Sequence, residues 1–226
     1  MTTENQARPR VFGIGSVSTL ILAASLMAPA GRAAEPATVI VVVNVQEKDF
    51  VSRVGVLLRK RNIPMFDFDF KAAFTQELMS RLAGDKHMQY RLAKPEDGIP
   101  NLPPPQPGTF SLPLKLYKEA AAAKPDAGMV LRVDIEAVGA ITGLGTSYYT
   151  LTGAMVMVSG KGKVLWCQGD YIGPTGFAPD WQIKVDGSVD AHQADNQKLM
   201  KENINKIIEK YCASKVGKLQ KKEFKD

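Results

Sequence analysis

Apolar and polar residues alternate most regularly in the segment 129–172. Apolar side chains occupy every second position at its start, at Met129, Leu131, Val133, Ile135 and Ala137. Charged residues fill intervening positions, at Arg132, Asp134 and Glu136. A period of two is typical of a β-strand with one buried face and one solvent-exposed face. The pattern therefore predicts a strand over 129–138 whose charged residues face water.

Two further strands are predicted to complete a three-strand antiparallel meander. Apolar runs over 148–158 and 163–172 are separated by Ser159-Gly160-Lys161-Gly162, which predicts a tight hairpin turn. A glycine-rich loop over 139–146 is expected between the first two strands, and its candidate contact residues are Gly143, Gly145 and Tyr148. These glycines are weak evidence for phosphate binding, because the third glycine and the following helix of a dinucleotide-binding motif are missing.

Two apolar stretches precede the meander near the start of the chain. The continuous β-branched run over 38–45 predicts a strand that is buried on both faces and lies centrally in a sheet. A weaker apolar stretch over 50–58 ends at Arg59-Lys60-Arg61. We interpret that basic triplet as a solvated turn after a strand.

The periodicity then changes to that of a helix. Large apolar residues recur every four positions from Phe70 to Leu82, which predicts an amphipathic helix that ends before Gly84. Asp67 or Asp69 can cap its first turn. The next segment, 87–93, is predicted to be an edge strand.

Proline and alanine dominate the middle of the chain, and a basic helix closes it. The proline-rich segment 95–113 predicts a surface loop, and the alanine-rich segment 114–124 predicts a short helix. A last amphipathic helix is expected from Asp195 or Asn196 to Val216 or Leu219.

These elements predict an α/β (α+β) fold. We expect one mixed β-sheet, with a C-terminal three-strand antiparallel meander, packed by two or three helices. The expected domain covers 34–219 and is followed by a disordered basic tail over 220–226. At 226 residues, the chain is long enough for one such domain and an export segment.

Residues 1–33 resemble a secretory signal peptide. Arg8 and Arg10 precede an apolar stretch over 17–28, and small residues allow cleavage near Ala30 or Ala33. A periplasmic or secreted protein is therefore expected. The alternative is an N-terminal anchor in the inner membrane, since 11–30 contains no charged residue.

The net charge of +6 is concentrated at the two ends of the chain. From Lys198 to Asp226 there are nine lysines and four acidic residues. The last helix therefore has a candidate interaction surface made of Lys198, Lys201, Lys206, Lys210, Lys215 and Lys218. This local and arginine-poor patch does not favour nucleic acid as a partner.

The chain has two cysteines, Cys167 in the third meander strand and Cys212 on the apolar side of the last helix. In an exported protein such a pair predicts a disulfide. The alternative is two separate buried thiols.

Catalytic motifs are missing from the sequence. It has two histidines, His87 and His192, and neither lies in a known nucleophile or zinc-binding pattern. The acid-rich segment 180–195 lacks the spacing of a calcium loop and is interpreted as a solvated linker. We therefore expect no enzyme, no cofactor and no metal site.

The order of elements resembles a group of envelope proteins of Gram-negative bacteria. The similarity rests on the apolar first strand, the amphipathic helix, the sequence Gly128-Met-Val-Leu-Arg-Val-Asp, the sequence Gly162-Lys-Val-Leu-Trp166 and the terminal helix. The group includes the penicillin-binding-protein activator lipoproteins and the curli-secretion lipoprotein, whose domain is similar to the anticodon-binding or TolB N-terminal α/β fold. The resemblance implies a fold and a compartment. It transfers no functional residue, and the lipidated cysteine of those families is missing.

Three functions remain open from the sequence. The first is a non-enzymatic periplasmic accessory protein that binds another envelope protein. The second is a soluble carrier of a small apolar ligand, suggested by Phe70, Phe74, Tyr149, Met155 and Met157. The third is weak peripheral binding to anionic lipid through the lysine-rich last helix.

Overall fold

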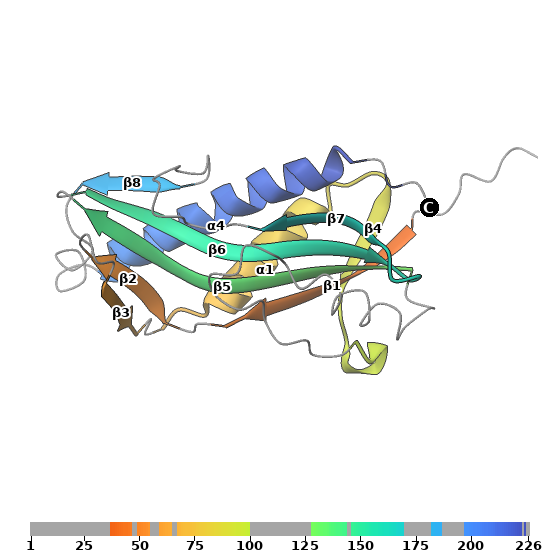
Figure 1. Ribbon diagram of the computed structural model, residues 1–226, viewed down its shortest axis with the longest axis horizontal. Helices are drawn as coiled ribbons and strands as arrows, with labels where there is room; N and C mark the ends of the chain where they lie inside the picture. Colours follow the sequence, from red (N-terminus) through yellow and green to blue (C-terminus); the bar gives the residue numbers. More distant parts are fainter. Residues whose placement is uncertain are drawn as a thin grey trace, which may run out of the picture. The chain divides into compact units, whose positions relative to one another are not determined.

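The computed structural model describes most of the chain after Pro36 (Figure 1). The described residues are 37–46, 49–54, 59–64, 67–99, 128–143, 146–169, 182–186, 197–222 and 224. The chain divides into two units, Met1–Glu35 and Pro36–Asp226, and every described element belongs to the second. The expected export segment, the expected helix over 114–124 and most of the proline-rich loop lie outside the described residues.

One mixed sheet of eight strands forms the centre of the described unit. Its strands are β1 (Ala37–Val45), β2 (Phe50–Val54), β3 (Arg59–Ile63), β4 (Met88–Leu92), β5 (Met129–Gly143), β6 (Thr146–Ser159), β7 (Val164–Gly169) and β8 (Ile183–Asp186). The order is β3-β2-β5-β1-β4, and β6 pairs with β5, β7 and β8. β1 runs parallel to β4 and β5, whereas β5, β6 and β7 are joined by antiparallel pairings. The predicted mixed sheet and its meander are therefore confirmed.

β1 lies between β4 and β5, and its central residues are buried on both faces. Val39 and Val41 on one face are at most 1% exposed, and Ile40 between them is 5% exposed. An uninterrupted β-branched segment matches this position, because neither face needs polar residues. β4 ends the strand order on this side, as predicted for an edge strand.

Two α-helices pack on one face of the sheet. α1 (Phe70–Leu82) begins after Asp69, whose Oδ1 accepts a hydrogen bond from the Ala72 N–H at 2.9 Å. α4 (Gln197–Gln220) contacts β6, β8 and α1. The first and the last of the three predicted helices are confirmed, and α4 continues one residue beyond Leu219. The proline-rich segment begins with a short 3-10 helix, η1 (Pro95–Asp97).

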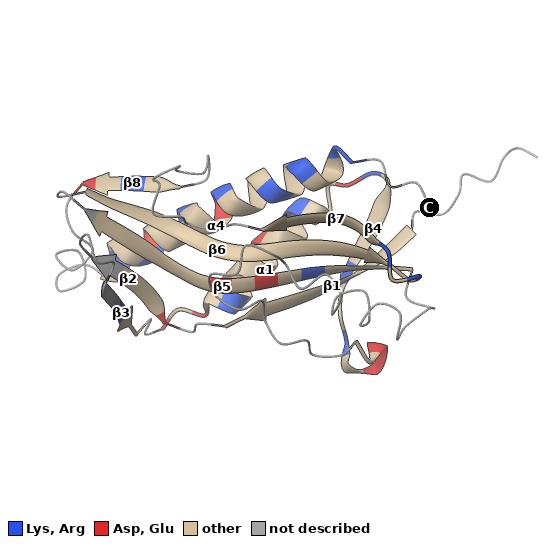
Figure 2. Cartoon of the chain, viewed as in Figure 1, with Lys and Arg blue, Asp and Glu red and all other residues tan. Residues whose placement is uncertain are grey.

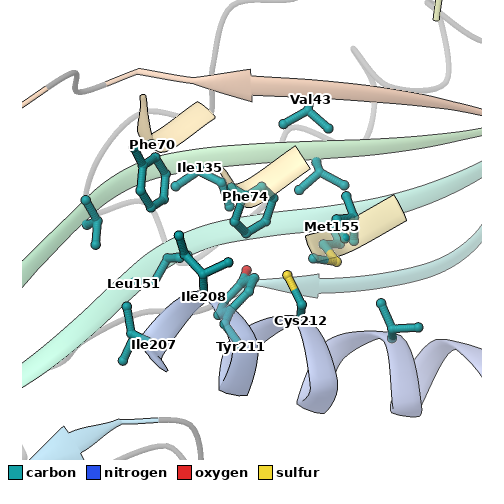
Figure 3. Packing of buried hydrophobic residues seen from close by; sticks show 14 of the residues in the cluster. Val43, Phe70, Phe74, Ile135, Leu151, Met155, Ile207, Ile208, Tyr211 and Cys212 are labelled. Carbon is teal, nitrogen blue, oxygen red and sulfur yellow. The ribbon is translucent and has the colours of Figure 1, made fainter. Parts of the chain in front are cut away.

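The core lies between these helices and the sheet. Figure 3 shows Phe74 of α1 directed toward Tyr211 of α4, with Met155 of β6 beside them. The ring centroids of Phe74 and Tyr211 are 6.1 Å apart, and those of Phe70 and Phe74 are 5.9 Å apart. The aromatic residues at a four-residue spacing therefore join the two helices to each other and to the sheet.

Two predicted loops belong to strands instead. Arg59-Lys60-Arg61 forms the start of β3, which pairs antiparallel with β2, so the interpretation as a solvated turn is wrong. The predicted loop over 139–146 is mostly strand, because β5 continues to Gly143 and β6 begins at Thr146. Pairing with β2 and β6 extends both strands into a segment whose glycines predicted a loop.

Gly139 is required where β5 approaches β2. A Cβ atom at this position would lie 2.0 Å from the Val51 carbonyl oxygen. Such a contact is far inside van der Waals range, so the backbone of one strand would have to move. The glycine therefore allows a close strand approach and does not mark a loop.

The predicted solvent-exposed face of β5 is also wrong. Arg132 is 3% exposed and Asp134 is 1% exposed. The β5–β6 register shifts between Ile135 and Ala137, which places Glu136 in a β-bulge. A bulge adds one residue to one strand and so reverses the alternation beyond it. Val138 therefore faces the core, where uninterrupted alternation would have placed Ala137. Both faces of β5 are therefore buried.

Candidate functional site

The lysines of α4 fall into two groups by exposure. Four are exposed, and we call them the α4 lysine face: Lys198, Lys206, Lys210 and Lys218. Lys201 is half-buried. Figure 2 shows the basic residues along the outer side of α4. Most of the predicted interaction surface is thus available to a partner.

Lys215 does not belong to that surface. Its residue is 3% exposed, and its Nζ lies 3.4 Å from the Gln168 Oε1 of β7. The same Nζ lies 5.4 Å from the centroid of the Tyr211 ring, within the range of a cation–π interaction. The ammonium group therefore joins α4 to β7 inside the fold, and including Lys215 in the interaction surface was wrong.

A second group of lysines surrounds a hollow at one end of the sheet. The hollow has a volume of about 570 Å³ and lies where β1, β4 and β5 begin. We call it the strand-start hollow, and its lining residues are Ala37, Asp85, His87, Met88, Met129, Gln220, Lys221, Lys222 and Phe224. It joins segments from four parts of the chain, so no local motif indicated it.

The turn between β6 and β7 lies at the same end of the sheet. The Gly160 N–H donates to the Gly128 carbonyl oxygen at 2.7 Å, directly before β5 begins. Lys161 and Lys163 of this turn are exposed. Lys86, Lys221 and Lys222 are exposed as well. Figure 2 shows basic residues at the β6–β7 turn and at the C-terminal end of α4.

Asp85 organises the polar side of the hollow. Its Oδ1 accepts from the His87 backbone N–H at 2.8 Å, and its Oδ2 accepts from the Tyr90 hydroxyl at 3.0 Å. Burial, together with the charge of Asp85 and this hydrogen bond, raises the pKa of Tyr90 above its usual value. Tyr90 therefore remains a hydroxyl donor at any physiological pH, and the Asp85 carboxylate has a partner on each oxygen.

The candidate loop contacts are only partly described. Gly143 is the last residue of β5, and Gly145 lies outside the described residues. Tyr148 of β6 is 36% exposed and pairs with Ile141 of β5 and Lys184 of β8. Its ring is thus on a strand and not on a loop tip.

The residues suggested for an apolar ligand belong to the packed core. Phe74, Tyr149, Met155 and Met157 are fully buried, and Phe70 is 4% exposed. Tyr149 also packs on Phe50, with ring centroids 5.4 Å apart. These side chains therefore contact other protein side chains, and the strand-start hollow is lined by different residues.

The two cysteines are free thiols, so the predicted disulfide is wrong. Trp166 of β7 is directed into the core, and the next residue, Cys167, is exposed. Cys212 is fully buried between α4 and its neighbours. A register shift between β6 and β7 at Met157 and Val158 alters the alternation along this pair. The sequence pattern alone does not reveal this shift.

The two thiols should differ strongly in reactivity. Burial raises the pKa of the Cys212 thiol to about 12, so the reactive thiolate is scarce. We expect iodoacetamide at mildly alkaline pH to label Cys167 in the native protein and both cysteines after denaturation without reductant. Mass spectrometry of the intact protein counts the labels. A denatured, unreduced protein that takes up no label would instead establish a disulfide.

Neither a metal-binding cluster nor a membrane-spanning helix is found in the described part of the chain. No group of three or more His, Cys, Asp or Glu residues there has the geometry to hold a metal ion. None of the helices among the described residues is both long and apolar enough to cross a membrane. Asp186, from the acid-rich segment 180–195, ends β8.

Comparisons with known proteins identify no specific family. No family model matches the sequence. No curated protein matches it either.

Three solved structures share a distant similarity. A hypothetical protein of Chlamydia trachomatis has a TM-score of 0.41 and 10% identity, covering 82% of this chain and 96% of its own. A lipoprotein of Neisseria meningitidis has a TM-score of 0.35 and 14% identity, and the match covers 76% of this chain and 98% of the lipoprotein chain. A homologue of neuraminyllactose-binding hemagglutinin from Helicobacter pylori has a TM-score of 0.40 and 14% identity, and the match covers 83% of this chain and 87% of the Helicobacter chain. Similarity at this level does not transfer a function to this chain.

Proposed function

We propose that this chain is a non-enzymatic accessory protein of the bacterial cell envelope that binds another envelope protein through the α4 lysine face. The proposal rests on one observation: four exposed lysines recur along a helix whose buried residues are fixed in the core. Export by residues 1–33 and the lack of a catalytic motif are inferred from the sequence.

The α4 lysine face has the dimensions of a protein contact. At about 1.5 Å per residue, the helix separates Lys198 from Lys218 by roughly 30 Å. Lys206 and Lys210 are four residues apart and therefore lie one above the other on the helix surface. A partner with acidic residues along a similar length would complement this surface.

Two acidic residues interrupt the lysines and restrict which partner fits. Glu202 and Glu209 are exposed among them. A partner with uniform negative charge would meet repulsion at these positions, whereas a partner with matching basic residues would not. Alternating charges therefore favour recognition of one protein surface over general binding to polyanions.

The buried side of α4 holds the helix in place. Ile204, Ile207 and Tyr211 are fully buried in the core cluster. Because the helix is already ordered, binding a partner does not incur the entropic cost of ordering its backbone.

Replacing the α4 lysine face by glutamine should weaken binding to the partner. The quadruple variant Lys198→Gln, Lys206→Gln, Lys210→Gln and Lys218→Gln loses four surface charges without altering the core, so we expect an affinity loss on the order of tenfold or more. Photo-activated cross-linking in envelope extracts, which does not require lysine amines, followed by mass spectrometry of the cross-linked peptides, measures this loss.

The control variant changes four exposed lysines elsewhere, Lys161→Gln, Lys163→Gln, Lys221→Gln and Lys222→Gln. It removes the same charge and should retain the cross-links to α4. Equal loss in the two variants would indicate a response to net charge alone and would contradict the proposal.

A further inference from the structure

The end of the sheet around the strand-start hollow combines three properties that are separate from the α4 lysine face. The first property is positive charge. Five exposed lysines lie there, at Lys86, Lys161, Lys163, Lys221 and Lys222. The exposed His87 lines the hollow between them. Asp85 is the only carboxylate among the described residues that line the hollow.

The second property is an apolar wall within this basic rim. Ala37, Met88, Met129 and Phe224 line the hollow together with the polar residues. Phe224 is half-buried and packs against the core cluster, although it follows the end of α4. A volume of about 570 Å³ lies within the ordinary range of ligand sites. The site therefore suits a molecule with an anionic group and an apolar part.

The third property is the position of the N-terminal segment. β1 begins at Ala37, and Ala37 itself lines the hollow. The polypeptide that precedes it, which contains the uncharged stretch 11–30, therefore connects to the sheet through the strand that lines the hollow.

We infer that the strand-start hollow and its lysines form a binding site for an anionic phospholipid at the membrane surface. The lysines attract the lipid phosphate. Each basic residue within a Debye length of an anionic membrane surface strengthens this attraction. The methionines and Phe224 contact the glycerol and the first part of the acyl chain. The site adds a membrane contact to the proposed protein contact and uses different lysines.

Neutralising this end should release the protein from anionic membranes. The chain is expressed from residues 1–226, and the form that accumulates in the cell is purified. Its partition is measured by co-sedimentation with vesicles of phosphatidylcholine, with and without phosphatidylglycerol, at low and high salt. The variant Lys161→Gln, Lys163→Gln, Lys221→Gln and Lys222→Gln should weaken partition to phosphatidylglycerol vesicles on the order of a hundredfold. Raised salt should weaken partition of the wild-type chain as well.

The matched control is the quadruple glutamine variant of the α4 lysine face. It has the same net charge and should bind vesicles like the wild-type chain. Phe224→Ser removes an apolar contact outside the helices, so it should weaken binding several-fold without changing the salt dependence.

Three outcomes would overturn the inference. Equal loss in both quadruple variants would show attraction by net charge, and equal partition to vesicles without phosphatidylglycerol would show binding through the apolar N-terminal stretch. If inorganic phosphate, at the same concentration as the lipid phosphate, displaced the protein from the vesicles completely, the site would be one for a free anion. None of these results affects the proposed protein contact, because cross-linking to α4 tests that contact separately.

Discussion

Replacing Asp134 with alanine is expected to lower the free energy of unfolding by about 3–5 kcal/mol. The two carboxylate oxygens of Asp134 accept from the Arg132 Nε and from the Asn44 Nδ2, each at 2.8 Å. The alanine variant would leave the guanidinium of Arg132, whose side chain is 4% exposed, without this counter-charge. It would also remove the side-chain hydrogen bond that joins β1 to β5. Urea denaturation followed by circular dichroism measures the change.

Two variants on the same strand test the reason for this loss. Asp134→Asn retains an acceptor for Asn44 and removes the charge, so its cost should be intermediate. Glu136→Ala removes a half-buried carboxylate at the bulge and should cost less than either. If Asp134→Ala cost no more than Glu136→Ala, the buried ion pair would not contribute to stability in the way its geometry indicates.

Phe74→Ala should also cost about 3–5 kcal/mol, because it leaves a cavity between two helices and the sheet. Phe74 is fully buried and contacts both the Phe70 and the Tyr211 rings. No small movement of α1 can fill this space, since Asp69 caps the helix and Leu78 and Leu82 are fully buried. Thermal denaturation should show a lower midpoint, by roughly 2–4 °C for each kcal/mol.

Lys71→Ala is the matched control for Phe74→Ala, because Lys71 is exposed on the same helix. It should change stability by less than about 0.5 kcal/mol. Phe74→Leu should recover part of the loss by filling part of the cavity. A thermal midpoint of Phe74→Ala equal to that of Lys71→Ala would mean that the contact between α1 and α4 is not a main part of the core.

Elements that depend on local signals were predictable from the sequence. α1 is an example, because its apolar spacing, its capping residue Asp69 and its last turn all lie within about fifteen residues. β1 is another, because a β-branched segment of this length has few alternatives to a buried strand. In both cases the secondary structure that the local sequence favours agrees with the environment of the segment in the folded protein.

Features that depend on a distant partner were not predictable. Arg132 and Asp134 follow an alternating pattern that predicts exposure, but both are buried and Asp134 accepts a hydrogen bond from Asn44 of β1. Lys215 has a charge that predicts a surface position, but Gln168 and Tyr211 provide partners inside the fold. The bulge at Glu136 is a property of the β5–β6 pair and not of β5 alone.

The candidate sites differ in the same way. The α4 lysine face lies on one helix, so its members were predictable except for the buried Lys215. The strand-start hollow requires the parallel register of β1 with β4 and β5, which brings Ala37, Met88 and Met129 to one end of the sheet. Phe224 was expected in a disordered tail, yet it is half-buried against the core.

The position of β1 between two later strands also affects the time course of folding. The contact of Asn44 with Asp134 spans 90 residues, and the register of β1 with β5 depends on pairing across the same length of chain. At ~5–20 residues per second, a ribosome needs roughly 5–20 s to synthesise that length. Parallel pairing over such separations is also intrinsically slow. The first strand therefore remains without β5 during this interval, and the centre of the sheet cannot close until residues 129–135 have left the ribosome.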